Sequence, residues 1–408
     1  MKRLVVCCDG TWKRADDRYV SNIEKIARAI AMRDDEGNVQ PVHYSAGVGT
    51  GAFKLDRILG GAFGVGLDDN LLDAYRFLAL NYDPDEGDEI CIFGFSRGAY
   101  TARSLVGMIN YLGLLTPAGI VDPPKSVVDP LRRGGVLRHA LDAYRKRPDG
   151  SVEVNRGTRY APFEGAVHET MPRIGFLGVF DTVGALGIPG LSRRRHRFHD
   201  VELPSQVDVA RQALAIDERR RIFSPAVWEK GKNKTTNVRQ VWFEGVHCDI
   251  GGGYENHAPS DLTLRWMVSE AAKCKLAFDW KLLRVAGPDE SLTANESLKL
   301  PYWILNQFGV IGDTYRRIRD PHRVSRLRRG RRILERENDA GSVLIAQPAD
   351  DRKSLRPTER RVAARNVDDW MEMCDPLPVE KVPTIDEIAT RRLTTASASS
   401  TPAVVSAT

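Results

Sequence analysis

The sequence predicts an α/β protein built on a mostly parallel, doubly wound sheet with helical insertions. Two observations carry this prediction. Short apolar runs that resemble buried strands alternate with amphipathic helical patterns through the first part of the 408-residue chain, and short polar turns join them. The strand segments are predominantly apolar rather than strictly alternating with polar residues, as is typical of parallel strands that helices cover on both faces.

The expected strands are short apolar runs, and they span residues 3–8, 41–44, 89–95, 174–180 and 238–243. The first expected helix follows Ser21, which opens a capping box with Glu24. A second, amphipathic helix is expected over 67–82, and a third begins directly after Ser96. Ser260 is expected to cap a fourth helix.

A sharp turn is predicted where the strand over 89–95 ends. Residues 94–98 read G-F-S-R-G, which is a G-x-S-x-G pattern centred on Ser96. In this pattern a nucleophilic serine lies on a strained strand-to-helix turn with its hydroxyl exposed. The N–H groups of the new helix then point at any anion that forms there. The alternative is an ordinary strand-to-helix turn that happens to contain serine.

Two further residues are expected to work with Ser96. A serine nucleophile needs a base that removes its proton, and that base needs an acid that fixes its tautomer. In α/β-hydrolases the three follow in the order Ser, Asp, His, each at the carboxyl end of a strand. Asp181 and His247 have this order and placement, and of the eight histidines only His247 and His257 follow a late strand. Asp249 is an alternative acid or a supporting residue.

An oxyanion hole is expected beside the predicted nucleophile. Its donors would be the backbone N–H of Arg97 and one from Gly10 or Thr11, which follow the first strand at the same edge of the sheet. Asp9 precedes these two residues. It is either a supporting residue or a turn residue that caps its own backbone.

Neither a metal nor another cofactor is expected. The six cysteines lack the paired spacing of zinc sites, and they are expected to be buried free thiols. The glycine-rich runs at 45–51 and 60–66 lack the Lys-Ser/Thr of a P-loop, which favours loops near the site over nucleotide binding.

The chain contains no apolar run of the ~18 residues that a membrane-spanning helix needs. Its first apolar run is also too short for a signal peptide. We therefore expect a cytoplasmic protein, or one that is exported without a signal peptide. Any contact with a membrane would be peripheral.

The predicted hydrolase domain covers residues 1–300, with insertions at 115–173 and 185–237. The second insertion has an apolar patch beside the basic cluster at 193–197. Such a segment suits either a lid over a lipid site or a solvated loop.

The last quarter of the chain departs from the strand–helix pattern. Residues 301–382 are expected to form a basic extension of helices and loops. Its arginine-rich arm at 316–332 is either solvated or attracts anionic lipid or nucleic acid. Residues 383–408 are rich in Thr, Ala, Ser and Pro, and a disordered tail is expected there.

Four separated segments together resemble one protein family. They read V-C-C-D-G-T-W at 6–12, G-F-S-R-G-A-Y-T-A-R at 94–103, G-V-F-D-T-V-G-A-L-G at 178–187 and G-V-H-C-D-I-G-G-G-Y at 245–254. In this order they resemble the catalytic domain of type VI secretion lipase effectors and their bacterial and fungal relatives, over about residues 1–275. The resemblance implies an α/β-hydrolase fold and phospholipase activity, with Ser96 as nucleophile, Asp181 as acid and His247 as base.

The predicted function is a serine hydrolase that cleaves a carboxylester, of a phospholipid or another lipid, through an acyl-enzyme. The expected partners are the lipid or ester substrate, a membrane surface, and a type VI secretion apparatus or an immunity protein. One alternative is a non-catalytic module that binds membrane or nucleic acid through its basic arm, although nucleic acid is not favoured. Another is a housekeeping esterase for small soluble esters.

Overall fold

The computed structural model describes residues 1–10, 19–47, 63–123, 135–146, 163–183, 203–218, 220, 223, 225–228, 235–283, 285, 295, 342–346, 379–383 and 387. Several predicted features lie outside these residues. They are Thr11, residues 48–51 and 60–62 of the glycine-rich runs, the basic cluster at 193–197, the arm at 316–332, and residues 384–386 and 388–408 of the tail.

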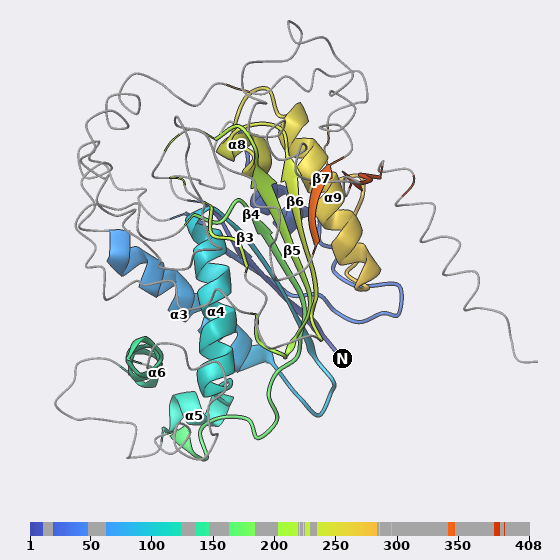
Figure 1. The fold of residues 1–408 in the computed structure, drawn as a ribbon. Helices are drawn as coiled ribbons and strands as arrows, with labels where there is room; N and C mark the ends of the chain where they lie inside the picture. The colour runs from blue at the N-terminus through green and yellow to red at the C-terminus, as the bar shows by residue number, and fades with distance from the viewer. Residues whose placement is uncertain are drawn as a thin grey trace, which may run out of the picture.

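Across the described residues, eight strands form one sheet in the order β2-β1-β3-β4-β5-β6-β7-β8, and every neighbouring pair is parallel (Figure 1). Their bounds are β1 (Arg3–Cys8), β2 (Val42–Ser45), β3 (Glu89–Phe95), β4 (Ile174–Phe180), β5 (Val207–Ala215), β6 (Asn237–Phe243), β7 (Ser342–Ala346) and β8 (Val379–Glu380). The strand order reverses at β1, because β2 lies on one side of it and β3 on the other. The carboxyl ends of β1 and β3 therefore form the switch point where such sheets bind ligands.

Helices cover both faces of the sheet, which confirms the predicted α/β class. They are α1 (Asn22–Ala29), α3 (Phe63–Asn81), α4 (Arg97–Leu112), α5 (Pro117–Val121), α6 (Val136–Arg145), α8 (His247–Gly251) and α9 (Ala258–Lys273). Helices α3, α4 and α6 lie on one side of the sheet and α9 on the other (Figure 1). Buried side chains of the first three helices share one core cluster, and those of α1 and α9 share a second. Strand β1 serves both layers: Leu4 and Val6 belong to the first cluster, and Val5 and Cys7 to the second.

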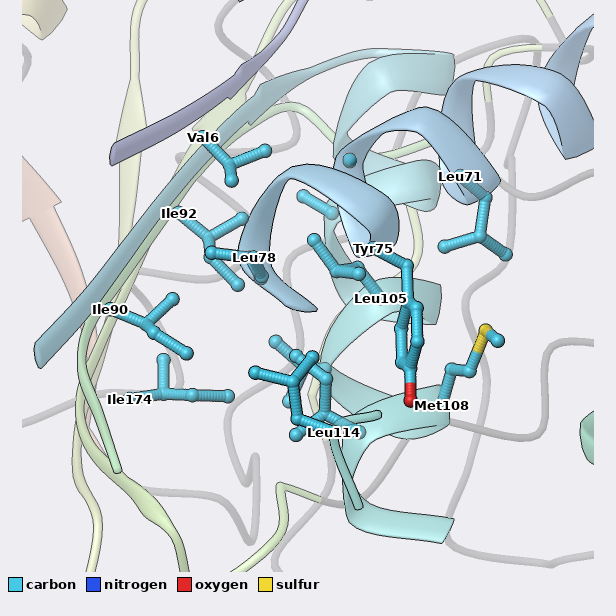
Figure 2. Close-up of a cluster of buried hydrophobic side chains, with 14 of the residues drawn as sticks. Val6, Leu71, Tyr75, Leu78, Ile90, Ile92, Leu105, Met108, Leu114 and Ile174 are labelled. Carbon is cyan, nitrogen blue, oxygen red and sulfur yellow. The ribbon is translucent and has the colours of Figure 1, made fainter. Parts of the chain in front are cut away.

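The first core cluster fixes α4 on the sheet. Figure 2 shows aliphatic side chains of the strands facing those of α3 and α4; the labelled residues are Val6, Leu71, Tyr75, Leu78, Ile90, Ile92, Leu105, Met108, Leu114 and Ile174. The Tyr75 hydroxyl donates to the Gly113 carbonyl at 2.8 Å and accepts from the Leu115 N–H at 3.1 Å, so this buried polar group is satisfied. These bonds attach the C-terminal end of α4 to α3.

One strand, β5, was missed by the sequence analysis. It pairs with β4 and β6 in the centre of the sheet, so the predicted insertion at 185–237 is wrong for residues 207–215. Arg211 and Gln212 interrupt its apolar run, which hid the strand. Both are buried: Arg211 Nε lies 2.5 Å from Glu270 Oε2 of α9, and Gln212 Nε2 donates to the Ala226 carbonyl at 3.0 Å.

Two further expectations are corrected. The extension at 301–382 was predicted as helices and loops, but β7 and β8 lie within it and continue the sheet. The arginine-rich surroundings concealed these short strands. Helix α9 begins at Ala258 rather than after Ser260, because Pro259 is suited to the first turn of a helix. The Ser260 hydroxyl donates to the His257 carbonyl at 2.8 Å instead of capping the helix.

Candidate active site

The carboxyl ends of β3 and β4 bring two of the predicted residues to the same edge. Ser96 follows β3 and Asp181 follows β4, and the Ser96 N–H donates to the Phe180 carbonyl at 3.0 Å. Both residues have positive φ, 57° for Ser96 and 38° for Asp181. Backbone of this kind is strained for a residue with a Cβ and is concentrated at functional sites.

Two glycines make the turn at Ser96 possible. A Cβ on Gly98 would lie 2.1 Å from the Cys8 carbonyl oxygen, and one on Gly94 would lie 2.6 Å from the Ala99 Cα. The end of β1 and the first turn of α4 approach too closely for any larger residue. The G-x-S-x-G spacing therefore has a steric cause in this fold.

His247, the first residue of α8, joins Ser96 to Asp181. Its Nε2 lies 2.8 Å from Ser96 Oγ, and its Nδ1 lies 2.6 Å from Asp181 Oδ2. The other oxygen of Asp181, Oδ1, accepts the Ala215 N–H at 3.0 Å, which orients the carboxylate. All three side chains are buried. The arrangement is a continuous hydrogen-bonded line from hydroxyl to imidazole to carboxylate.

Two aromatic rings enclose the imidazole of His247. The centroids of the Phe95 and Phe223 rings each lie 4.7 Å from that of His247. Burial lowers the pKa of His247 from its ordinary value, although the hydrogen bond and charge of Asp181 oppose this. The imidazole is therefore neutral near pH 7, the form in which it can accept a proton.

The predicted oxyanion-hole residues lie beside Ser96 as far as the structure describes them. Arg97 begins α4. A Cβ on Gly10 would lie 3.4 Å from the Ser96 Cβ, so the Gly10 backbone is adjacent to the serine. The Gly10 N–H, however, donates to Asp9 Oδ1 at 2.6 Å. In this arrangement it is directed at Asp9 rather than at the serine hydroxyl.

Asp9 and Asp249 both support neighbouring segments. The Asp9 Oδ2 accepts from the Ser21 hydroxyl at 2.5 Å and from the Tyr44 hydroxyl at 2.8 Å. Asp249 Oδ2 accepts the N–H groups of Val246 and Asn295, each at 2.9 Å. Burial raises the pKa of Asp249.

In contrast to these two residues, Asp181 is in hydrogen-bond contact with the His247 ring. Of the acids considered from the sequence, it has the position that orients an imidazole.

Three residues after β5 reach the same site and were missed by the sequence analysis. Glu218 accepts the His247 backbone N–H at 3.1 Å, and it is ion-paired with Arg220. Arg220 in turn lies over the ring of Phe223. The segment was assigned to an insertion, and no motif marks it. Recognition of β5 as a strand would have shown that its carboxyl end lies at this edge.

Within the described ranges, no group of three or more His, Cys, Asp or Glu residues is placed to hold a metal ion. The cysteines described there, Cys7, Cys8, Cys91, Cys248 and Cys274, are free thiols. None of the helices in the same ranges is both long enough and apolar enough to cross a membrane.

A parallel sheet with a serine, a histidine and an aspartate hydrogen-bonded in line at its carboxyl edge defines an α/β-hydrolase-like protein. Residues 2–270 match the family described as the T6SS phospholipase effector Tle1-like catalytic domain. Since this match covers more than half of the chain, the chain belongs to that family. The resemblance predicted from the four motifs is thereby confirmed.

Other proteins share parts of this sequence or fold. An uncharacterized protein of Saccharomyces cerevisiae is 27% identical over 241 residues, which cover 54% of this chain and 32% of that protein. An uncharacterized protein from Pseudomonas aeruginosa has a crystal structure with 18% identity and a TM-score of 0.40, over 72% of this chain and 49% of the other. A Tle1 effector bound to the VgrG spike of the type VI secretion system has 20% identity and a TM-score of 0.32, over 62% and 51%. The chain thus spans about a third of the yeast protein and about half of each solved structure.

Proposed function

We propose that the protein is a serine hydrolase that cleaves a carboxylester through an acyl-enzyme on Ser96. The observation that carries the proposal is the hydrogen-bonded line from Ser96 Oγ through His247 to Asp181, with distances of 2.8 and 2.6 Å. Its geometry suits transfer of the hydroxyl proton to Nε2 as the oxygen attacks an ester carbonyl.

The two half-reactions use the same three residues. In the first, the Ser96 oxygen bonds to the carbonyl carbon, His247 takes the proton and then gives it to the departing alcohol. In the second, His247 takes a proton from water as its oxygen bonds to the acyl carbon, and it then gives that proton to the departing Ser96 oxygen, which releases the acid and restores the serine hydroxyl. Asp181 keeps the proton on Nδ1 and stabilises the imidazolium that forms in both steps.

The negative oxygen of each tetrahedral intermediate requires backbone donors. The Arg97 N–H, at the start of α4, is our first proposed donor because the dipole of that helix also favours an anion. We assign the second donor to Gly10, whose backbone is adjacent to Ser96, or to Thr11, the next residue in the sequence. If it is Gly10, its N–H must first leave Asp9 Oδ1.

A phospholipid or another lipid ester is the proposed substrate, and the membership of residues 2–270 in a phospholipase effector family supports it. Contact with the membrane would be peripheral. A related Tle1 effector has been solved bound to the VgrG spike, and this supports the secretion apparatus as a proposed partner. An immunity protein is a further proposed partner.

The first test is labelling with a fluorescent fluorophosphonate, which reacts with activated serines. We expect the native chain to be labelled and the Ser96→Ala and His247→Ala variants to remain unlabelled. The latter variant retains the serine hydroxyl, so its failure to react would show that the base activates it. Thermal unfolding curves establish that each variant is folded. A folded native chain that does not react would refute the proposal.

The second test concerns the substrate. Release of fatty acid from phospholipid vesicles is compared with hydrolysis of p-nitrophenyl butyrate in solution, with Ser96→Ala as the control for both. We expect release from the vesicles that Ser96→Ala abolishes. Hydrolysis of the soluble ester alone would refute the lipid assignment and favour a small-ester esterase.

A further inference from the structure

A buried carboxylate outside the triad holds the backbone of the proposed base. Glu218 follows β5, and its side chain is fully buried. Its Oε2 accepts the His247 N–H at 3.1 Å and a hydrogen bond from Arg220 Nη2 at 2.8 Å. Its Oε1 accepts the backbone N–H and the Nε of Arg220, at 2.8 and 2.9 Å. Four hydrogen bonds satisfy this buried carboxylate and fix it in place.

The residue before Glu218 is bound to the same loop. The Asp217 N–H donates to the Gly245 carbonyl at 2.9 Å, and the Gly245 N–H donates to Asp217 Oδ2 at 2.7 Å. The segment after β5 is therefore hydrogen-bonded to two residues that follow β6, Gly245 and His247. These contacts make the position of α8 depend on residues 217–218.

Arg220 extends this anchor to the imidazole ring. Its guanidinium carbon lies 3.8 Å from the centroid of the Phe223 ring. The Phe223 ring in turn meets the His247 ring edge to face, with 4.7 Å between the centroids. Stacking of a guanidinium on an aromatic face restrains both groups. Glu218 thus contacts the His247 backbone directly and its ring through Arg220 and Phe223.

We propose that Glu218 and Arg220 are positioning residues for the base, holding the His247 imidazole between Ser96 and Asp181. The proposal rests on the proposed serine hydrolase function, because it assigns the pair to the same site. A displacement of ~1 Å at a reacting group is enough to lower the rate about 100-fold. Loss of Glu218 or Arg220 should therefore reduce activity strongly.

The two charges also act on His247 in opposite directions. Burial is the largest influence and lowers the pKa of His247, and the hydrogen bond and charge of Asp181 oppose it. Next in order, the cation of Arg220 lowers this pKa and the anion of Glu218 raises it. Arg220 itself faces Cys248 and Tyr254 as well as Glu218. Removal of one charge from the pair should therefore move the titration of His247 one way, and removal of the other should move it the opposite way.

The experiment measures the rate constant for fluorophosphonate labelling of the full chain from about pH 5 to 8, the range in which histidines titrate. Glu218→Gln, Arg220→Met and the double variant are compared with the native chain and with Ser96→Ala. The double variant removes both charges together, so it provides a folded comparison if either single variant leaves a buried charge unpaired and unfolds.

We expect each single variant to slow labelling at the pH optimum by about 10- to 100-fold. The acid limb of the profile is the low-pH range over which the labelling rate falls as His247 is protonated. It should move to lower pH in Glu218→Gln and to higher pH in Arg220→Met. In the double variant the acid limb should return toward that of the native chain, while the rate remains low.

Glu270→Gln is the matched control. The Glu270 carboxylate is also buried against an arginine, with Arg211 Nε at 2.5 Å, but this pair lies between β5 and α9. We expect Glu270→Gln to lower the melting temperature and to leave the acid limb of the labelling profile unchanged.

Three results would overturn the assignment: native rates in the folded variants, acid limbs that move in the same direction, or an equal effect of Glu270→Gln. Failure of the native chain itself to react would instead overturn the serine hydrolase function.

Discussion

The carboxyl and amino ends of the central strands differ in their backbone conformation and in the partners of their buried charges. At the carboxyl edge, Ser96 and Asp181 have positive φ and lie in a hydrogen-bonded line with His247. At the amino edge, Arg3 of β1 is buried and bonded to two carboxylates, that of Asp34 and that of Glu89, the latter at 3.1 Å from Nε. The carboxyl edge combines strained backbone and the polar line with the Glu218–Arg220 pair, whereas Arg3 at the amino edge forms ion pairs far from the triad.

The difference separates stability from reactivity within one sheet. A buried ion pair satisfies both charges in the folded state, so removal of one partner lowers the free energy of unfolding. The Asp181 carboxylate instead accepts the Ala215 N–H and faces the imidazole, which places a negative charge where a cation forms during the reaction. Substitutions at the two edges should therefore affect different measurements.

The largest expected effect is that of Asp181→Asn on turnover. The amide oxygen can still accept the Ala215 N–H, which leaves the NH₂ group facing His247 Nδ1. His247 must then carry its proton on Nε2, where it cannot accept the proton of Ser96. We expect kcat to fall by about 10⁴-fold while the melting temperature changes little. A kcat within tenfold of the native value, measured with a soluble ester, would contradict the proposed acid.

At the amino edge, Arg3→Met should affect stability rather than turnover. It leaves the Asp34 carboxylate, whose side chain is only 4% exposed, without its arginine. We expect the free energy of unfolding to fall by about 3–5 kcal/mol. The labelling rate per folded molecule should match that of the native chain.

Lys2 provides a control at the same edge. It pairs with Asp88 at 3.1 Å, and the Lys2 side chain is 33% exposed, so solvent screens its charge. The Asp88 carboxylate is fully buried, but it also accepts the backbone N–H groups of Lys2 and Asp83, which Lys2→Met retains. We expect Lys2→Met to cost no more than about 1 kcal/mol. Equal losses for Lys2→Met and Arg3→Met in urea denaturation would contradict the role given to burial at this edge.

The sequence was informative where one local pattern determines one structure. The runs at 3–8, 89–95 and 174–180 are continuous and apolar, and they match β1, β3 and β4 in both bounds. Ser96, Asp181 and His247 could be selected because their placement at strand ends is a property of chain order. Their assignment to catalytic roles stays a prediction, which the labelling experiment tests.

What the sequence concealed depends on contacts between distant segments. From the sequence alone, Arg211 resembles a surface residue. In the structure it is buried and paired with Glu270, 59 positions later in the chain. Glu218 likewise has no local motif, because its partner is the backbone N–H of His247 on the next strand's loop. Buried polar residues satisfied by remote partners carry no periodic signal in the sequence.

The close approach of β1 to α4 can be tested with Gly98→Ala. A methyl group there would lie 2.1 Å from the Cys8 carbonyl oxygen, so the turn that carries Ser96 must shift. We expect a loss of ~1–3 kcal/mol in stability together with slower labelling, since Gly98 lies in the same turn as Ser96 at the carboxyl edge.

Gly175→Ala in β4 is the matched control, because the nearest atom to its added methyl group is the Ile90 carbonyl oxygen at 4.0 Å. Its stability should change by less than ~1 kcal/mol, with a native labelling rate. Equal effects of the two substitutions would show that the contact with Cys8 is not what requires glycine.

The smallest expected effect is the response to pH. Burial holds the pKa of His247 below the ordinary 6.5 in the folded protein, whereas the unfolded chain titrates near that value. As the pH falls through 6.5 the unfolded chain takes up the proton first, so stability decreases until the folded pKa is passed. The acid limb of kcat/KM should accordingly have its midpoint below pH 6.5, and His247→Gln should remove this part of the stability loss. A midpoint above 6.5 would indicate that the Asp181 carboxylate, rather than burial, dominates the electrostatics of the carboxyl edge.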